Sequence, residues 1–240
     1  VRFFGGDLVG MITAEFLKAD AVVVPISCND AIDMGPLRNV VQPKTRIGSP
    51  YVIAGMERAR QRGCRAVCGF EANGGFLVGT DLWQADRCLS ALPTRDAMLP
   101  ILSVLARART EGVSVSGLFD RLPQRYGKAA LLRPFERSKG RLIVTRLSPS
   151  HSALCEVAFA NGGVRCTDAA GQPLDAAEGD RNELARIRDV LAGFFPAALG
   201  FGRIVRLNYT DGVRVWFDNG EVAHVRPSGN ADELRIYAVA

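Results

Sequence analysis

This chain of 240 residues lacks several features that would place it in a particular class. No apolar run approaches the roughly 18 residues that a membrane-spanning helix needs. The opening residues Val1-Arg2-Phe3-Phe4 contain neither an initiator Met nor the pattern of a signal peptide. We therefore expect a cytoplasmic protein without membrane contacts, whose natural start lies upstream. The six cysteines form no close Cys-x-x-Cys pair, which predicts reduced packing residues and not zinc or dithiol chemistry.

Dense clusters of one charge are also absent, although the net charge is +5 and the pI about 9.1. Arginines are spread along the chain with acidic residues between them, and no RNP, KH or zinc-finger signature occurs. Diffuse positive charge suits a small anionic substrate as well as it suits nucleic acid. We rank phosphorylated metabolites above nucleic acid, and a basic nucleic-acid-binding α/β protein stays as an alternative.

With 48% hydrophobic residues the chain can bury a sizeable core, and its length allows one large domain or two small ones. Apolar residues at helical spacing follow Asp7, which we expect to cap a first helix, and residues 21–26 have the composition of a buried strand. A second helix is expected from Ser49, its N-cap, to about Arg62. This order of elements predicts an α/β sandwich with a mixed sheet over residues 1–125.

The third helix of this domain is expected to begin with Thr94 as its cap and Asp96 in its first turn. Its predicted apolar face consists of five residues at helical spacing: Met98, Ile101, Leu102, Leu105 and Ala108. A domain boundary between Pro123 and Lys128 is expected because the hydrophobic pattern changes there. Residues 133–179 show weak periodicity, and their elements are not assigned.

Residues 126–240 are expected to form a separate α+β domain. Asp180 and Glu183 make a capping-box pattern, and a helical stripe of apolar residues follows it: Leu184, Ile187, Leu191 and Phe194. Asp211-Gly212 and Asn219-Gly220 are strong hairpin signals, and the residues between them alternate in polarity. The pattern predicts an antiparallel sheet with helices on one face.

Two turns carry candidate binding groups. In residues 71–75, which we call the Glu71 loop, Asn73 and two glycines between apolar strands allow a sharp turn that presents the acceptor oxygens of Glu71, a match for sugar hydroxyls. In residues 226–230, the Arg226 loop, the side chains of Arg226, Ser228 and Asn230 with the backbone at Gly229 offer donors that could enclose a phosphate. A solvated Glu and an ordinary polar β-turn are the alternatives.

A third candidate site is the expected helix start at Ser49. Its free N–H groups and positive dipole end, with Arg46 just before them, could bind an anion. An ordinary capped helix is the alternative.

Four segments together resemble the α-D-phosphohexomutase superfamily, which includes bacterial phosphomannomutases and phosphoglucomutases. Phe70-Glu71-Ala72-Asn73-Gly74-Gly75 is similar to the family's sugar-reading loop Gly-Glu-x-Ser-Gly-His, and Arg226-Pro227-Ser228-Gly229-Asn230 to its phosphate loop Arg-x-Ser-(Asn/Gly)-(Thr/Asn). Thr45-Arg46-Ile47-Gly48-Ser49 and Thr210-Asp211-Gly212-Val213-Arg214 resemble its Thr-x-(Val/Ile)-Gly-x and Asp-Gly-(Val/Leu)-Arg segments. The resemblance covers nearly the whole chain and is weakest between about residues 130 and 200.

The resemblance implies the third domain for residues 1–125 and the fourth for residues 126–240, the latter with a four-stranded antiparallel sheet of the TATA-box-binding-protein-like kind. It also implies the ligand residues. Sugar contacts are expected from Glu71, Asn73, Gly74, Arg46 and Ser49, and phosphate contacts from Arg226, Ser228, Gly229 and Asn230. Departures from the family pattern are Ser49 where a His is common, Asn73 and Gly75 in place of Ser and His, Ser27 near a usual Lys, and Asp232 in place of a Pro.

The family's phosphoserine loop, Thr-(Ala/Ser)-Ser-His-Asn-Pro, and its metal loop, Asp-x-Asp-x-Asp-Arg, do not occur in this sequence. Phosphoryl transfer depends on positioning and on a metal that offsets developing charge. We therefore expect an inactive chain that is the carboxyl-terminal half of a phosphomannomutase/phosphoglucomutase, an intramolecular phosphotransferase. The missing N-terminal domains would supply the phosphoserine and the Mg²⁺ ligands, and hexose phosphates and a hexose 1,6-bisphosphate would be the substrate and intermediate. A non-catalytic sugar-phosphate-binding protein is the other alternative.

Overall fold

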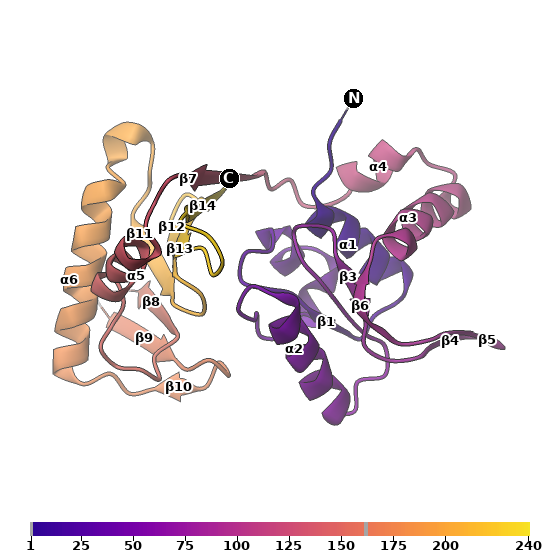
Figure 1. Ribbon diagram of the computed structural model, residues 1–240, viewed down its shortest axis with the longest axis horizontal. Helices are drawn as coiled ribbons and strands as arrows, with labels where there is room; N and C mark the ends of the chain where they lie inside the picture. Colours follow the sequence, from indigo (N-terminus) through magenta and orange to yellow (C-terminus); the bar gives the residue numbers. More distant parts are fainter. Residues whose placement is uncertain (1, 161–162) are drawn as a thin grey trace. The chain divides into compact units, whose positions relative to one another are not determined.

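The computed structural model describes residues 2–160 and 163–240, which fall into two compact units, Val1–Arg125 and Tyr126–Ala240. Figure 1 shows both units, and each is described by itself. The described part of the chain contains no helix with the length and apolar character of a membrane span.

Unit 1 combines helices and short strands. Its elements are α1 (Gly6–Phe16), β1 (Ala21–Val23), α2 (Ser49–Gln61), β2 (Val67–Phe70), β3 (Phe76–Val78), β4 (Leu82–Gln84), β5 (Arg87–Leu89), β6 (Leu92–Asp96), α3 (Met98–Glu111) and α4 (Val115–Asp120), with two short 3₁₀ turns at Asp30–Asp33 and Pro36–Asn39. The sheet has the order β1-β2-β3-β6, in which β1 and β2 are parallel and the other neighbours antiparallel. The predicted mixed sheet is therefore confirmed.

Two cores cover the two faces of this sheet. Helices α1, α3 and α4 lie on one face, where Met11 and Ile12 pack with Phe70 and Phe76. Helix α2 lies on the other face, where Val52 and its neighbours pack against the alternate residues of β1, β2 and β3. The result is a three-layer α/β/α sandwich with the Glu71 loop at the end of its β2–β3 hairpin (Figure 1).

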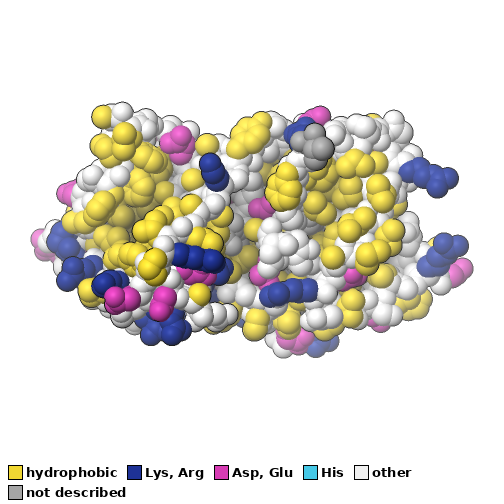
Figure 2. All heavy atoms as spheres, turned by 45° about the horizontal axis from the view of Figure 1, so that its top comes forward, with side chains coloured by type: hydrophobic (Ala, Val, Ile, Leu, Met, Phe, Trp, Pro, Cys, Tyr) yellow, Lys and Arg dark blue, Asp and Glu magenta, His cyan; other side chains and the backbone are white. Residues whose placement is uncertain are grey.

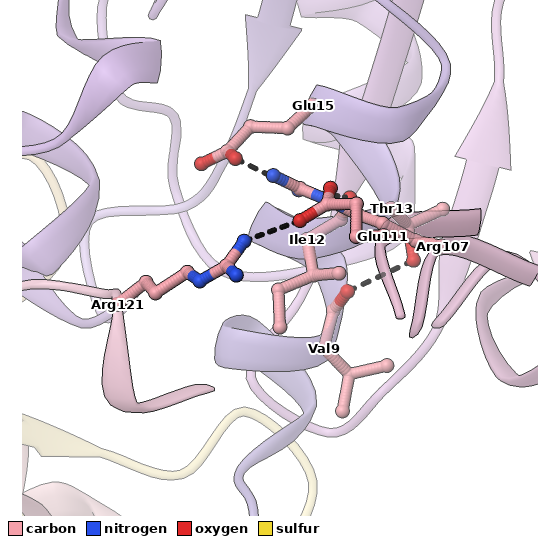
Figure 3. A network of polar contacts seen from close by, with 7 residues as sticks. All are labelled: Val9, Ile12, Thr13, Glu15, Arg107, Glu111 and Arg121. Atoms are coloured by element: carbon pink, nitrogen blue, oxygen red, sulfur yellow. Dashed lines mark hydrogen bonds and ion pairs between the residues drawn. The ribbon is translucent and has the colours of Figure 1, made fainter. Parts of the chain in front are cut away.

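A polar network joins the helices on the first face (Figure 3). Arg107 on α3 donates to the Glu15 carboxylate of α1 at 2.8 Å and to the Ile12 carbonyl at 3.3 Å. The same guanidinium bonds Glu111, which also pairs with Arg121 beyond α4. Because Arg107 and Glu15 are largely buried, this pairing fixes the packing of α1 against α3 more firmly than a surface ion pair would.

Helix starts are where the sequence predictions were least accurate. Gly5, Gly48 and Ala97 occupy the N-cap positions of α1, α2 and α3, and Ala177 occupies that of α6 (Glu178–Phe194) in unit 2, none with a side-chain cap bond of its own. The Asp7 carboxylate instead accepts N–H groups from Leu8 and Asn29, and Thr94 lies within strand β6. Asp180, which was expected as an N-cap, is the third residue of α6, where its carboxylate accepts the N–H group of Ala177 at 3.1 Å.

Four of the five residues in the apolar stripe predicted on α3 face solvent and are not part of the core. Met98, Ile101, Leu102 and Leu105 are each more than half exposed, while Val104 and Ala108 are buried. Figure 2 shows hydrophobic side chains gathered on the side of unit 1 that carries α3. An apolar stripe on a helix predicts that this face packs against another apolar surface, but the pattern does not identify that surface.

Unit 2 is an antiparallel sheet covered by two helices. Its elements are β7 (Gly127–Leu132), α5 (Arg137–Arg146), β8 (Glu156–Ala160), β9 (Gly163–Thr167), β10 (Pro173–Leu174), α6 (Glu178–Phe194), β11 (Ile204–Asn208), β12 (Val213–Phe217), β13 (Val222–Pro227) and β14 (Leu234–Val239), with a 3₁₀ turn at Ala197–Leu199. Leu184, Ile187 and Leu191 of α6 form the core with β8, β11 and β12, and Val144 of α5 and its C-cap residue Leu147 pack against the same cluster. The α+β arrangement with helices on one face is confirmed (Figure 1).

The expected number of strands is wrong. Eight strands among the described residues form the sheet, in the order β10-β9-β8-β11-β12-β13-β14-β7, where four were expected. Three of the additional strands come from residues 133–179, whose periodicity is weak, and β7 is exposed along its whole length and gives no alternating pattern. Phe194 was also expected in the core but is 68% exposed, and Phe195 packs on Phe217 in its place.

Candidate functional site

The Glu71 loop closes the β2–β3 hairpin through its own backbone. Glu71 N donates to Gly75 O at 3.1 Å, and Gly74 N donates to Glu71 O at 3.0 Å. The side-chain oxygen of Asn73 accepts from Gly75 N at 3.0 Å, and Gly74 has a φ of +92°, which favours glycine. The predicted sharp turn is thus confirmed, and its residues hold each other in place.

Glu71 is almost fully buried, with 5% of its surface exposed. Its Oε1 accepts the Ser49 hydroxyl at 2.7 Å, and its Oε2 is 3.4 Å from Asn73 Nδ2. A carboxylate offers about four acceptor positions, so these contacts leave capacity for further hydroxyl donors. The structure brings together three residues that the sequence had assigned to one site.

Arg95 completes this cluster and was missed in the sequence. Its Nε donates to Ser49 Oγ at 2.9 Å, and its Nη2 lies 3.9 Å from Glu71 Oε1. Ser49 therefore relays between the two charged groups, accepting from Arg95 and donating to Glu71. A Cβ on Gly75 would approach the aliphatic stem of Arg95 to 3.0 Å, so the glycine leaves the space that the stem occupies.

The Arg95 side chain was overlooked because residues 94–96 were expected to begin a helix. In the structure they belong to β6, which pairs with β3 next to the Glu71 loop. Residues 91–96 read Ala-Leu-Pro-Thr-Arg-Asp and show no alternation of polar and apolar residues, so no sequence signal marks this strand and only its pairing with β3 reveals the place of Arg95.

Arg46 lies on the expected segment but is not at the carboxylate. Its guanidinium stacks over the Tyr51 ring, 5.3 Å from the ring centroid, and the residue is exposed. Ser49 is the first residue of α2, and Pro50 beside it has no N–H group. The structure therefore brings Ser49 to Glu71, and Arg46 stays a predicted contact at the surface of the same helix end.

The Arg226 loop follows strand β13 in unit 2. The Arg226 side chain is 12% exposed, and its Nε donates to Asp211 Oδ1 at 3.2 Å. Ser228 is buried, its N–H donates to the Glu233 carbonyl, and its Oγ is 3.4 Å from Asn230 N. Gly229 has open space where a Cβ would stand. The loop therefore combines a nearly buried guanidinium with an exposed tip.

Three arginines that the sequence did not mark as site residues support this loop. Arg137, the first residue of α5, donates from Nη1 to the Gly229 carbonyl at 3.3 Å. Arg133 bonds the buried carboxylate of Glu233 at 2.6 Å, and Arg235 bonds the same carboxylate at 3.0 Å. These contacts, Arg235 first, hold the pKa of Glu233 below its ordinary value. Arg133 and Arg137 lie in sequence regions without a motif, so only the tertiary structure reveals them.

Within residues 2–160 and 163–240, no group of three or more His, Cys, Asp or Glu side chains could hold a metal ion. The residues described here therefore do not fit a Mg²⁺ site, and no step of the chemistry below is assigned to a metal held by this chain.

A comparison with family models identifies the first unit. Residues 5–126 match the α/β/α domain III of phosphoglucomutase/phosphomannomutase. The chain belongs to this family. Its mixed sheet between two helical layers is thus that of a phosphoglucomutase/phosphomannomutase third domain.

Curated relatives agree with this assignment. A phosphomannomutase of Salmonella muenchen is 35% identical over 237 residues, which is 98% of this chain and 40% of the relative. A phosphomannomutase of Sinorhizobium fredii is also 35% identical over 237 residues and is covered to 41%. The chain therefore spans about two fifths of the length of these family members.

Solved structures show the fold of the family. The N-acetylphosphoglucosamine mutase of Aspergillus fumigatus, in complex with GlcNAc-6P and magnesium, is 15% identical and superposes with a TM-score of 0.53, over 100% of this chain and 44% of the fungal chain. A variant of that enzyme, crystallised with glucose 1,6-bisphosphate, has a TM-score of 0.54, with 40% of its chain covered. At this identity the similarity shows a shared fold alone.

Proposed function

We propose that this phosphoglucomutase/phosphomannomutase-family chain is the carboxyl-terminal half of a phosphohexomutase that interconverts hexose 6-phosphate and hexose 1-phosphate through a hexose 1,6-bisphosphate. Unit 2 would be its fourth domain, of the TATA-box-binding-protein-like class. The chain would recognise sugar and phosphate, and further domains of a longer protein would supply the phosphoserine and Mg²⁺. The two-fifths coverage of the phosphomannomutase relatives supports this division.

The observation that carries the proposal is the buried Glu71 carboxylate with spare acceptor capacity. A buried carboxylate is costly unless its charge is compensated, and here Ser49 and Arg95 compensate it only in part. Neighbouring hydroxyls of a hexose are donors that complete such a site. In this scheme Glu71 and Asn73 bind sugar hydroxyls, with the backbone at Gly74 and the Ser49 and Arg46 end of α2 beside them.

The Arg226 loop would bind the phosphate that is not being transferred. An Arg whose Nε is already bonded presents its outer N–H groups to a ligand, and a bidentate pair with phosphate is strong and directional. Ser228, Gly229 and Asn230 would add hydroxyl, backbone and amide donors. Hexose phosphates are thus the proposed ligands. We do not propose nucleic acid or a membrane as a binding partner. We place the enzyme in the cytoplasm.

The exposed apolar face of α3 supports the proposal of further domains. One face of α3 carries a row of apolar side chains that are exposed to solvent in this chain: Met98, Ile101, Leu102 and Leu105. We propose that the remaining domains of the full-length enzyme pack against this row. A charged substitution there should weaken the assembly of the complete enzyme while the 240-residue chain alone stays folded.

The sugar role is tested by Glu71→Gln, which keeps the shape of the side chain and removes its charge. In the complete enzyme we expect slower turnover of both mannose and glucose phosphates, and in this chain weaker binding of mannose 6-phosphate by calorimetry. Glu57→Gln, at an exposed Glu on α2, is the matched control. Unchanged activity and affinity of the Glu71 variant would refute the sugar role.

The phosphate role is tested by Arg226→Ala. A hydrogen bond to a charged group contributes about 1.5–3 kcal/mol, so KM for hexose phosphates should rise at least tenfold. Arg203→Ala, which removes an exposed Arg in unit 2, is the control. An unchanged KM in the Arg226 variant would exclude this loop as the phosphate site.

A further inference from the structure

The Arg226 guanidinium is held from one side only. Its Nε donates to Asp211 Oδ1, and within the described residues its two terminal nitrogens have no protein hydrogen-bond partner. Asp211 lies in the turn between β11 and β12 and is itself 12% exposed in its side chain. A carboxylate next to a phosphate-binding Arg reduces the positive charge of the site.

A buried histidine forms a hydrogen bond with the main chain of the turn that carries Asp211. His224 Nε2 lies 2.6 Å from the Asp211 carbonyl oxygen, and the ring stacks on Tyr237 with centroids 5.4 Å apart. A carbonyl only accepts, so Nε2 carries the proton and donates it. His224 and Arg226 are two positions apart on β13, which places both side chains on one face of the strand.

The same turn packs tightly against the backbone of β13. Gly212 has a φ of +83°, and a Cβ there would lie 2.3 Å from the Val225 carbonyl oxygen and 2.7 Å from Arg226 Cβ. The turn thus has three attachments to the strand: the His224 ring on its main chain, the close approach of Gly212, and the Asp211 carboxylate on Arg226. Such a triple attachment leaves Asp211 little freedom.

We propose that Asp211 and His224 are positioning residues that orient Arg226 for the phosphate of the substrate, an inference that rests on the proposed function. His224 fixes the main chain of Asp211, and the Asp211 carboxylate fixes the plane of the guanidinium through Nε. The terminal N–H groups then point to one place before the ligand arrives. Pre-orientation of this kind raises affinity by reducing the entropy lost on binding.

The test separates orientation from charge by measuring the affinity of the 240-residue chain for mannose 6-phosphate and for inorganic phosphate. Asp211→Ala removes a negative charge, and this change alone would tighten phosphate binding. We nevertheless expect binding to weaken about tenfold, because the Arg226 guanidinium loses the charge-assisted hydrogen bond that orients it. Asp211→Glu keeps the charge and displaces the carboxylate by one methylene, so it should weaken binding as well. Asp211→Asn keeps an acceptor oxygen for Nε and should bind at least as tightly as the unmodified chain.

His224 is tested in the same way. His224→Gln retains an N–H donor for the Asp211 carbonyl and should preserve affinity, whereas His224→Leu removes the donor and should weaken binding. Asp218→Ala is the matched control, because Asp218 makes a similar bond to Arg203 Nε at 2.9 Å from the opposite end of β12. It should leave phosphate affinity unchanged.

Two results would overturn the inference, and they differ from each other. If Arg226→Ala weakens binding but Asp211→Ala and Asp211→Glu both bind phosphate as tightly as the unmodified chain, the positioning role is wrong and the phosphate role stands. If Arg226→Ala itself leaves binding unchanged, the proposed phosphate site and the positioning role are both wrong. Free energies of unfolding measured for each variant separate weaker binding from loss of the fold.

Discussion

Acid should destabilise unit 2 through one buried histidine. Burial is the main cause that lowers the pKa of His224, from an ordinary 6.5 to about 4, and the nearby charge of Arg214 adds to it, although the bond to the Asp211 carbonyl opposes the change. Between these two pH values the unfolded chain binds a proton that the folded chain excludes. The free energy of unfolding therefore falls as the pH falls through this window, and the contribution is fully retained above about pH 7.

The size of the effect follows from the same two values. The interval from 6.5 to about 4 corresponds to a loss of about 3 kcal/mol, at most about 1.4 kcal/mol per pH unit. This is a large share of the 5–15 kcal/mol that typically stabilises a domain. The other histidine, His151, lies at the surface. Carboxyl groups of unit 2 with a lowered pKa, such as Glu233, also cause a loss of stability in acid, so the contribution of His224 is obtained by comparison with a variant that lacks this histidine.

Urea unfolding followed by tryptophan fluorescence can measure this pH-dependent loss in the free energy of unfolding. The sequence has two tryptophans, the exposed Trp83 of unit 1 and Trp216 of unit 2. In a Trp83→Phe background, Trp216 reports on unit 2 alone. Relative to His224→Gln, which cannot titrate, the chain with His224 should lose stability between pH 6.5 and 4.5. Parallel curves for the two proteins over this range would refute the reasoning.

Three further substitutions test the packing described above by urea unfolding. Gly6→Ala would place a Cβ 2.2 Å from the backbone of the Glu71 loop and should cost about 1–3 kcal/mol, while Gly179→Ala, with open space around it, should be neutral or slightly stabilising. Ile187→Ala should cost about 2–5 kcal/mol in the Trp216 signal because Ile187 is fully buried in unit 2. Leu102→Gln should change the stability of this chain by less than about 0.5 kcal/mol; a core-sized loss would contradict the exposed face of α3.

Periodic patterns and turn signals predicted much of the fold. The α6 core residues and the two hairpins at Asp211-Gly212 and Asn219-Gly220 are as expected, because alternation and glycine-dependent turns are local properties of the sequence. The α3 stripe was recognised as apolar but assigned to the wrong side, since a pattern of this kind does not identify the surface that covers it. Strand β7 gave no signal because all its residues are exposed.

Part of the candidate site was predictable because one loop contains its own groups, and Ser49 was assigned to the same site through the resemblance to the family. Glu71 and Asn73 are neighbours in sequence, and the structure keeps them together. Arg95 lies 24 positions beyond Glu71 and Arg137 far before the loop that it contacts, so their roles depend on strand pairing and helix docking. Sequence proximity thus identified the loops, and tertiary structure supplied the residues that hold them.

The most direct test of the account is a titration of the 240-residue chain with mannose 6-phosphate, followed residue by residue in amide NMR spectra. The account predicts that signals of both the Glu71 loop and the Arg226 loop move, that Glu71→Gln removes the first response, and that Arg226→Ala removes the second. If neither loop responds at millimolar ligand, or if the responding residues lie elsewhere in both units, the assignment of sugar and phosphate recognition to this chain is contradicted.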